Sequence, residues 1–249
     1  MSFLENLQLW FSEMKAEFIL NFVTGSRWKM LLTGLSNTFT MTAMALAIGI
    51  VIGILVAVVR STYETNGKKL RSKTARVILA ICNRLCIIYT TVIRGTPMVV
   101  QLLILYYIVF ASSRNGLMVA SFSFGLNSGA YVSEIFRGGI MSIDKGQMEA
   151  GRSLGLNYVQ TMWLIIAPQM FRNVLPTLAN EFITLIKETS IAGYVAVMDL
   201  TFAGNRIRGV TFSPMMPLIA VALIYLVLVM VLTWLTGKLE RRLRQSDIR

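Results

Sequence analysis

Two long stretches without a charged residue constrain the fold of this chain more than any other feature. They cover residues 31–59 and 210–237. About 20 consecutive apolar residues are enough for a helix to cross the hydrocarbon core of a membrane. Only 14% of the residues are charged and 55% are hydrophobic, whereas about 25% are charged in soluble domains. The sequence therefore predicts an all-α integral membrane protein.

Three further apolar segments bring the number of predicted spans to five. These segments are 77–113, about 117–143 and about 158–198. As one helix, the first would measure roughly 55 Å, which is more than the thickness of a membrane. We expect it to bend at residues 94–97, the sequence RGTP, because proline disrupts a helix. We expect the last of the three to be broken at Pro168 and Pro176 for the same reason.

The basic residues are distributed unequally between the two predicted sides of the membrane. Thirteen Lys and Arg residues lie on the side of the 60–76 loop, and six lie on the other side. Cytoplasmic loops of membrane proteins carry an excess of Lys and Arg. The sequence thus predicts an N-terminus outside the cell and a C-terminus inside. This asymmetry accounts for the net charge of +12, and we predict no nucleic acid partner.

The predicted membrane domain covers residues 28–240, and a shorter segment flanks it at each end. Residues 1–27 are predicted to form an interfacial helix, because apolar side chains recur there at helical spacing. These side chains are Phe3, Leu7, Trp10, Phe11, Met14 and Phe18. An amphipathic helix of this kind lies on the membrane surface. Residues 241–249 form a basic tail, which the charge asymmetry places in the cytoplasm.

Several classes of enzyme are excluded by what the sequence lacks. The chain has no histidine, so it holds no histidine metal site and no histidine general base. No cluster of metal ligands and no nucleophile beside a base stands out, so we predict neither a catalytic nor a metal site. The patterns GxxxxGKS and GxxxxGKT are also absent, which excludes ATP binding by a P-loop.

A polar segment, residues 143–160, separates the third and fourth predicted spans. Gly146 and Asn157 are the predicted bounds of a short helix within it. Ala150, Gly151 and Ser153 would give this helix small side chains, so that another surface could approach closely. An ordinary interfacial loop is the alternative interpretation.

Polar side chains form a stripe along the fourth predicted span, within an arc of roughly 120° at helical spacing. The members of this stripe are Thr177, Asn180, Glu181, Thr184, Lys187 and Glu188. Leu185 and Ile186 occupy the opposite side. Charged residues at membrane depth usually face a partner or water, so the stripe predicts a bundle interior or a solute path. The alternative is a set of salt bridges with Glu134 or Arg137, although these two are three residues apart and can pair with each other.

A fixed spacing in the polar segment is similar to the EAA motif of the permease subunits of ABC importers. The matching residues are Glu149, Ala150, Gly155, Ile165 and Pro168. Gly151 replaces the second alanine of that motif and Ala167 replaces its leucine. Three longer sequences, at residues 92–107, 128–155 and 167–190, and the short sequence DLT at residues 199–201 resemble the permeases of polar amino acid ABC importers. The resemblance covers residues from about 30 to 240.

That resemblance implies a five-span core of the ABC type I importer kind, which pairs with a second permease copy or with a paralogue. The helix at about 145–157 would be a coupling helix that docks on a cytoplasmic ABC ATPase dimer. The coupling residues would be Gln147, Glu149, Ala150, Gly151, Ser153 and Gly155. ATP and Mg²⁺ would bind to the ATPase, so this chain would be no enzyme and would hold no cofactor. The chain would be a multi-pass protein of a prokaryotic plasma or inner membrane, surrounded by lipid, with an amino acid binding protein outside.

A free amino acid as the solute would need acceptors for its ammonium group and donors for its carboxylate. Glu181 or Glu188 would accept from the ammonium, while Lys187 or backbone N–H groups freed at the RGTP break would donate to the carboxylate. The predicted path residues are Arg94, Gly95, Thr96, Glu134, Asn180, Glu181, Thr184, Lys187 and Glu188. Two alternatives stay open, which are an importer of another small polar solute, such as an opine, and an ATP-independent channel or carrier.

Overall fold

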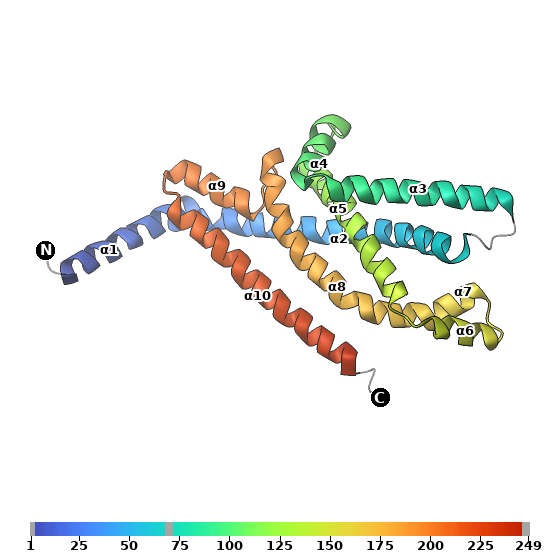
Figure 1. Cartoon of the computed structure of the whole chain (residues 1–249). Coiled ribbons are helices and arrows are strands. Elements are labelled where there is room, and N and C mark those ends of the chain that lie inside the picture. The colour runs from blue at the N-terminus through green and yellow to red at the C-terminus, as the bar shows by residue number, and fades with distance from the viewer. Residues whose placement is uncertain (1–2, 68–71, 246–249) are drawn as a thin grey trace.

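The computed structural model describes residues 3–67 and 72–245, and the regular elements in that part are helices (Figure 1). The long helices are α2 (Trp28–Asn66), α3 (Lys73–Gly95), α5 (Gly116–Met141), α8 (Ala167–Glu188) and α10 (Met215–Gln245). The shorter α-helices are α1 (Phe3–Phe18), α4 (Met98–Ile104), α6 (Lys145–Ser153), α7 (Tyr158–Thr161) and α9 (Leu200–Thr211). Lys68, Lys69 and Arg71 of the predicted basic loop, and residues 246–249 of the predicted tail, lie outside the described residues.

Short π- and 3₁₀-helical segments adjoin several of these helices. The π segments are Ile19–Val23, Leu105–Val109 and Met162–Ile166, and the 3₁₀ segments are Thr24–Ser26 and Thr189–Val195. The π segment Met162–Ile166 changes the helix geometry but does not end the helix. Residues 158–188 therefore form one continuous helical path from the polar segment through α7 to the end of α8 (Figure 1).

Three of the described helices are long and apolar enough to cross a membrane, judged by length and composition. They cover Trp28–Thr65, Lys73–Gly95 and Met215–Leu243. α5 and α8 have 26 and 22 residues, which is also sufficient to cross the hydrocarbon core, but both carry charged side chains. The described chain therefore combines three apolar spans with two span-length helices of mixed polarity.

α2 and α5 make the most extensive contact between two helices, because small residues line it. A Cβ atom on Gly53 of α2 would lie 2.5 Å from Val132 Cγ1, and one on Gly125 of α5 would lie 2.7 Å from Ile48 Cβ. Side chains larger than hydrogen would therefore push the two helices apart. Small residues are common where membrane helices pack closely. Lipid tails are as apolar as the side chains, so helix association depends on close van der Waals packing and not on the hydrophobic effect.

Three clusters of buried side chains hold the other helices against this pair. Their principal members are Met41, Leu102, Phe124 and Leu185 in the first, Leu31, Ile207 and Val221 in the second, and Ala57, Phe136 and Val174 in the third. The first cluster joins α2, α4, α5 and α8, and the second joins α2, α9 and α10. In contrast, Ile81 and Leu85 of α3 and Val227 of α10 are exposed, as expected for helices that contact lipid.

A buried asparagine in the π segment after α1 anchors that segment to the end of α9 and to the turn that follows. Asn21 Nδ2 donates to Ser213 Oγ at 3.1 Å, and Asn21 Oδ1 accepts from Thr211 Oγ1 at 2.7 Å. The chain kinks just after this point, where Gly25 and Ser26 have left-handed φ angles of 65° and 53°. α1 thus projects away from the helical body from a fixed point (Figure 1).

The predicted bend at RGTP is confirmed, because α3 ends at Gly95, Thr96 is extended and α4 begins at Met98. The predicted breaks at Pro168 and Pro176 are wrong. Pro176 lies inside α8, and Pro168 lies in its first turn, directly after the π segment Met162–Ile166. Membrane helices tolerate proline because local π adjustments and neighbouring groups satisfy the backbone atoms that its ring leaves free.

Candidate functional site

The polar stripe lies on the uncovered side of α8. Leu185 and Ile186 are fully buried, whereas Asn180, Thr184 and Lys187 are exposed. The buried side packs against α2 and α5 through the first hydrophobic cluster. The helix therefore presents its polar side chains to whatever lies beside this chain in the membrane.

Glu181 and Glu188 lie half-buried within this stripe. Ser128 Oγ of α5 donates to Glu181 Oε1 at 2.8 Å. Within the described residues, no ion pair shorter than 4.0 Å involves Lys187 or Glu188. In that part of the chain, Lys187 and Glu188 of the stripe therefore form no salt bridge with Glu134 or Arg137.

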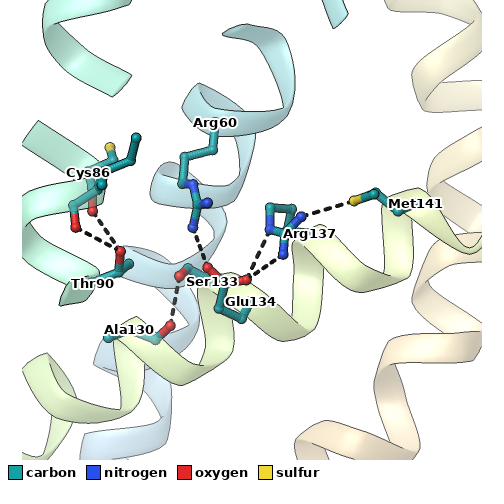
Figure 2. A network of polar contacts seen from close by, with 9 residues as sticks. Arg60, Cys86, Thr90, Ala130, Ser133, Glu134, Arg137 and Met141 are labelled. Atoms are coloured by element: carbon teal, nitrogen blue, oxygen red, sulfur yellow. Dashed lines mark hydrogen bonds and ion pairs between the residues drawn. The ribbon is translucent and has the colours of Figure 1, made fainter. Parts of the chain in front are cut away.

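Glu134 instead joins α5 to the end of α2 (Figure 2). Its Oε1 accepts from Arg60 Nη1, and its Oε2 accepts from Arg137 Nη2 at 2.7 Å and from Arg137 Nε at 3.0 Å. The pairing of Glu134 with Arg137 is confirmed, and Arg60 is a further partner that was not predicted from the sequence. A carboxylate with two guanidinium partners has little capacity left for a solute ammonium group. We therefore do not retain Glu134 as a path residue.

The backbone break after α3 is stabilised by one glutamine of α4. Gln101 Nε2 lies 2.7 Å from Ile93 O, 3.0 Å from Thr96 O and 2.8 Å from Thr96 Oγ1. Two carbonyl groups that lose helical partners at the break are thus satisfied. Gly95 and Thr96 are exposed, and the Arg94 guanidinium lies 5.4 Å from the centre of the Tyr131 ring.

Two neighbouring residues of α5 connect the break with the polar stripe. Asn127 Nδ2 donates to Gln101 Oε1 at 3.1 Å, while the adjacent Ser128 donates to Glu181. Gln101, Asn127 and Ser128 were not predicted as site residues from the sequence. Amide side chains inside apolar segments are visible in the sequence and indicate buried hydrogen bonds. Which of them pair depends on which helices pack together.

The predicted short helix in the polar segment exists as α6, but its predicted end at Asn157 is wrong. Asp144 Oδ1 accepts from Gly146 N at 2.6 Å and caps the start of α6. α6 ends at Ser153, because Gly155 has a φ of 86° and turns the chain. Asn157 instead caps the start of α7. Its Oδ1 accepts from Gln160 N at 2.9 Å, and Gln160 Oε1 accepts from Asn157 N at 2.9 Å.

The small residues of α6 face two different directions. Gly151 is buried, and a Cβ atom there would lie 2.6 Å from Thr161 Cγ2 and 2.9 Å from Ile165 Cδ1. Its small size therefore serves a contact within this chain, and the expectation that it meets another protein is not retained. Ala150 and Ser153 are exposed, as are Gln147 and Glu149.

The chain matches the protein family described as "Binding-protein-dependent transport system inner membrane component" over residues 75–245. It belongs to this family. The arginine transport system permease protein ArtQ of Bacillus subtilis (strain 168) is 35% identical over 220 residues, which cover 87% of this chain and 94% of ArtQ. The glutamine transport system permease protein GlnP of Escherichia coli (strain K12) is 35% identical over 220 residues, covering 86% and 93%.

The fold of this permease is also found in solved structures. A crystal structure of an amino acid ABC transporter with histidines superposes with a TM-score of 0.76 at 33% identity, covering 89% of this chain and 98% of that one. An inward-facing structure of the MetNI methionine ABC transporter gives a TM-score of 0.72 at 19% identity, which shows the fold alone. These likenesses confirm the all-helical fold of ABC importer permeases.

Membership of this family settles the class of function. The protein is a multi-pass inner-membrane permease component of a bacterial binding-protein-dependent ABC transport system, and it is not the ATPase subunit. The resemblance that the EAA spacing indicated is confirmed. The alternative of a channel or carrier without such a system is therefore dropped.

Proposed function

We propose that this permease serves an ATP-driven importer that moves polar amino acids into the cell. The observation that carries the proposal is the polar stripe of α8, in which the exposed Lys187 and the half-buried Glu188 are adjacent in sequence and form no ion pair among the described residues. A free amino acid carries both an ammonium group and a carboxylate, and one acidic and one basic side chain can meet both. Relatives named for arginine, glutamine and L-cystine transport support this solute class.

The same face suggests how the path is built. Charged side chains directed at lipid are unfavourable, by up to about 2.5–3.5 kcal/mol for Lys or Asp at the centre of a span; Lys187 and Glu188 lie in the last turn of α8. A second permease copy or a paralogue beside α8 would remove that penalty, because the two polar faces would enclose a wet path between them. We propose Asn180, Glu181, Thr184, Lys187 and Glu188 as residues that line it, with Arg94, Gly95 and Thr96 at the break contributing from α3.

We further propose five spans, which are α2, α3, α5, α8 and α10, with the N-terminus outside and the C-terminus inside. Ser61 and Glu64 at the end of α2 line the same hollow, about 420 Å³ in volume, as Lys145 and Glu149 of α6. The end of α2 and the polar segment are therefore on one side. α1 and α9 lie toward the opposite end of α2 (Figure 1). In this arrangement residues 28–240 are the membrane domain, α1 lies on the outer surface, and residues 241–249 are a cytoplasmic tail.

The exposed side of α6 would dock on the partner ATPase dimer. The residues proposed for this contact are Gln147, Glu149, Ala150 and Ser153, while Gly155 shapes the turn that follows. ATP and Mg²⁺ would bind to that ATPase, and a binding protein outside the membrane would deliver the amino acid. ATP-driven closure of the ATPase dimer would then move α6, which the continuous turns of α7, the π segment and α8 connect to the proposed path.

Reconstitution tests the proposed function directly. The permease purified with its ATPase and placed in liposomes, with the binding protein added outside, should take up radiolabelled arginine or glutamine only when ATP is enclosed. Leucine serves as an apolar control, because it lacks the polar side chain that the proposed solutes share. Uptake that does not depend on ATP, or equal uptake of leucine, would contradict the proposal.

Cysteine labelling in intact cells tests the orientation. In a background without Cys82 and Cys86, Ser112→Cys in the turn before α5 should react with a membrane-impermeant maleimide. Thr74→Cys in the first turn of α3 should react only after the membrane is permeabilised, because the charge asymmetry places that end in the cytoplasm. Both positions are exposed in the described chain, so accessibility within the protein does not differ. Labelling of Thr74→Cys in intact cells would contradict the proposed orientation.

A further inference from the structure

An apolar groove of about 420 Å³ runs between α8 and α10. Its lining includes Leu178, Phe182 and Ile183 of α8 and Leu232, Leu235 and Leu239 of α10. Thr236 also lines the groove, but its hydroxyl donates to Leu232 O at 2.9 Å. The groove therefore offers no free polar group to water along its described lining.

The groove and the polar stripe are on different sides of α8. At 3.6 residues per turn, Asn180 and Lys187 lie more than about 100° around the helix from the groove residues Leu175 and Phe182. If the polar stripe faces the second permease copy, as the proposed function has it, the groove faces away from that copy and toward the bilayer. An acyl chain can fill such a groove, whereas water would gain no hydrogen bonds there.

Basic and aromatic residues mark the level of the lipid headgroups at one end of this groove. Lys238 Nζ lies 3.6 Å from the centre of the exposed Trp234 ring, and Trp and Lys are typical of the membrane–water interface. Arg242 is exposed and follows Leu235 by seven residues and Leu239 by three, so it shares their side of α10. A guanidinium at that position can donate two hydrogen bonds to a phosphate.

We propose that the groove between α8 and α10 binds one anionic phospholipid of the cytoplasmic leaflet. One of its acyl chains lies along Leu178, Phe182 and Leu232, and its phosphate accepts hydrogen bonds from Arg242. The proposal rests on the pairing and orientation of the proposed function. The bound lipid would fill the space between the helix that carries the path and the last span.

Lipid titrations followed by native mass spectrometry of the purified permease–ATPase complex test this site. The probes are phosphatidylglycerol and phosphatidylcholine with identical acyl chains. Arg242→Gln should weaken phosphatidylglycerol binding about fivefold, which is the contribution of one basic residue near an anionic surface, and should leave phosphatidylcholine unaffected. Arg241→Gln is the matched control, because its side chain is exposed on the other side of α10 and the change in charge is the same. Equal weakening by both variants would overturn the site.

A second variant tests the apolar part. Ala179 lines the groove, and Ala179→Trp should displace both lipids while the ATPase still copurifies. Retention of phosphatidylglycerol by this variant would overturn the proposal, as would crosslinks from a photoreactive residue at Leu178 to the second permease copy. These readouts do not use transport. Loss of ATP-driven uptake in the reconstitution experiment would therefore refute the proposed function separately from the lipid site.

Discussion

Replacing Ala150 by aspartate should lower solute-stimulated ATP hydrolysis at least tenfold, while the permease still inserts into the membrane. Ala150 is exposed on α6, and its small side chain suits a surface against which another protein packs. A carboxylate buried in that contact without a partner would weaken docking by about 3–5 kcal/mol, which is more than about a hundredfold in the docking equilibrium. The measurement is ATP hydrolysis by the purified complex with binding protein and solute.

Gly155 is a less informative position, although the family motif includes it. Its φ of 86° strains any other residue, so a loss of coupling there would also follow from a displaced α6. Thr74→Asp is the matched control for Ala150→Asp, since it adds the same charge at an exposed position on the proposed cytoplasmic side. Normal stimulated hydrolysis in Ala150→Asp, or crosslinks from Ser153 that never reach the ATPase, would remove the assignment of α6 as the coupling helix.

Replacing Glu188 by glutamine should reduce amino acid uptake by roughly ten- to a hundredfold at limiting solute, with expression and assembly unchanged. Glu188 is half-buried and has no ion-pair partner in the described chain. If it accepts from the solute ammonium, losing that charge-assisted contact weakens the step by about 1.5–3 kcal/mol. Lys187→Met should act in the same direction through the solute carboxylate. Uptake in proteoliposomes is the measurement, and recovery of the ATPase during purification reports assembly.

Glu134→Gln is the matched control for this experiment, because it makes the same chemical change in a carboxylate that is already paired. Arg60 and Arg137 would lose their common acceptor, so the contact between α2 and α5 should weaken and the yield of assembled complex should fall. The complexes that do assemble should keep their apparent affinity for the solute. Normal uptake by Glu188→Gln, or a loss of assembly in both Glu188→Gln and Lys187→Met, would defeat the solute-path assignment of α8.

Several features of this protein follow from local sequence patterns alone. The uncharged stretches that became α2 and α10, the bend at RGTP and the polar stripe of α8 are all visible in the order of residues. Each depends on hydropathy, periodicity or proline stereochemistry over a few turns, and such short-range effects act before any helix meets another. The EAA spacing likewise indicated the permease family that the comparisons confirm.

Other features depended on which helices pack together. Periodicity placed Glu134 among polar residues at membrane depth, but its partner Arg60 lies 74 residues away, at the end of α2. Gly151 had the small side chain expected of a docking surface, yet packing against Thr161 and Ile165 turns it inward.

The same holds for the hydrogen bond from the Asn127 amide to the Gln101 amide and for the continuation of α8 through Pro176. The sequence by itself determined the long apolar helices and the polar face of α8, because these are local properties of the chain. The partners of each polar group were decided by the tertiary structure, because a buried donor must find its acceptor on whichever helix lies against it.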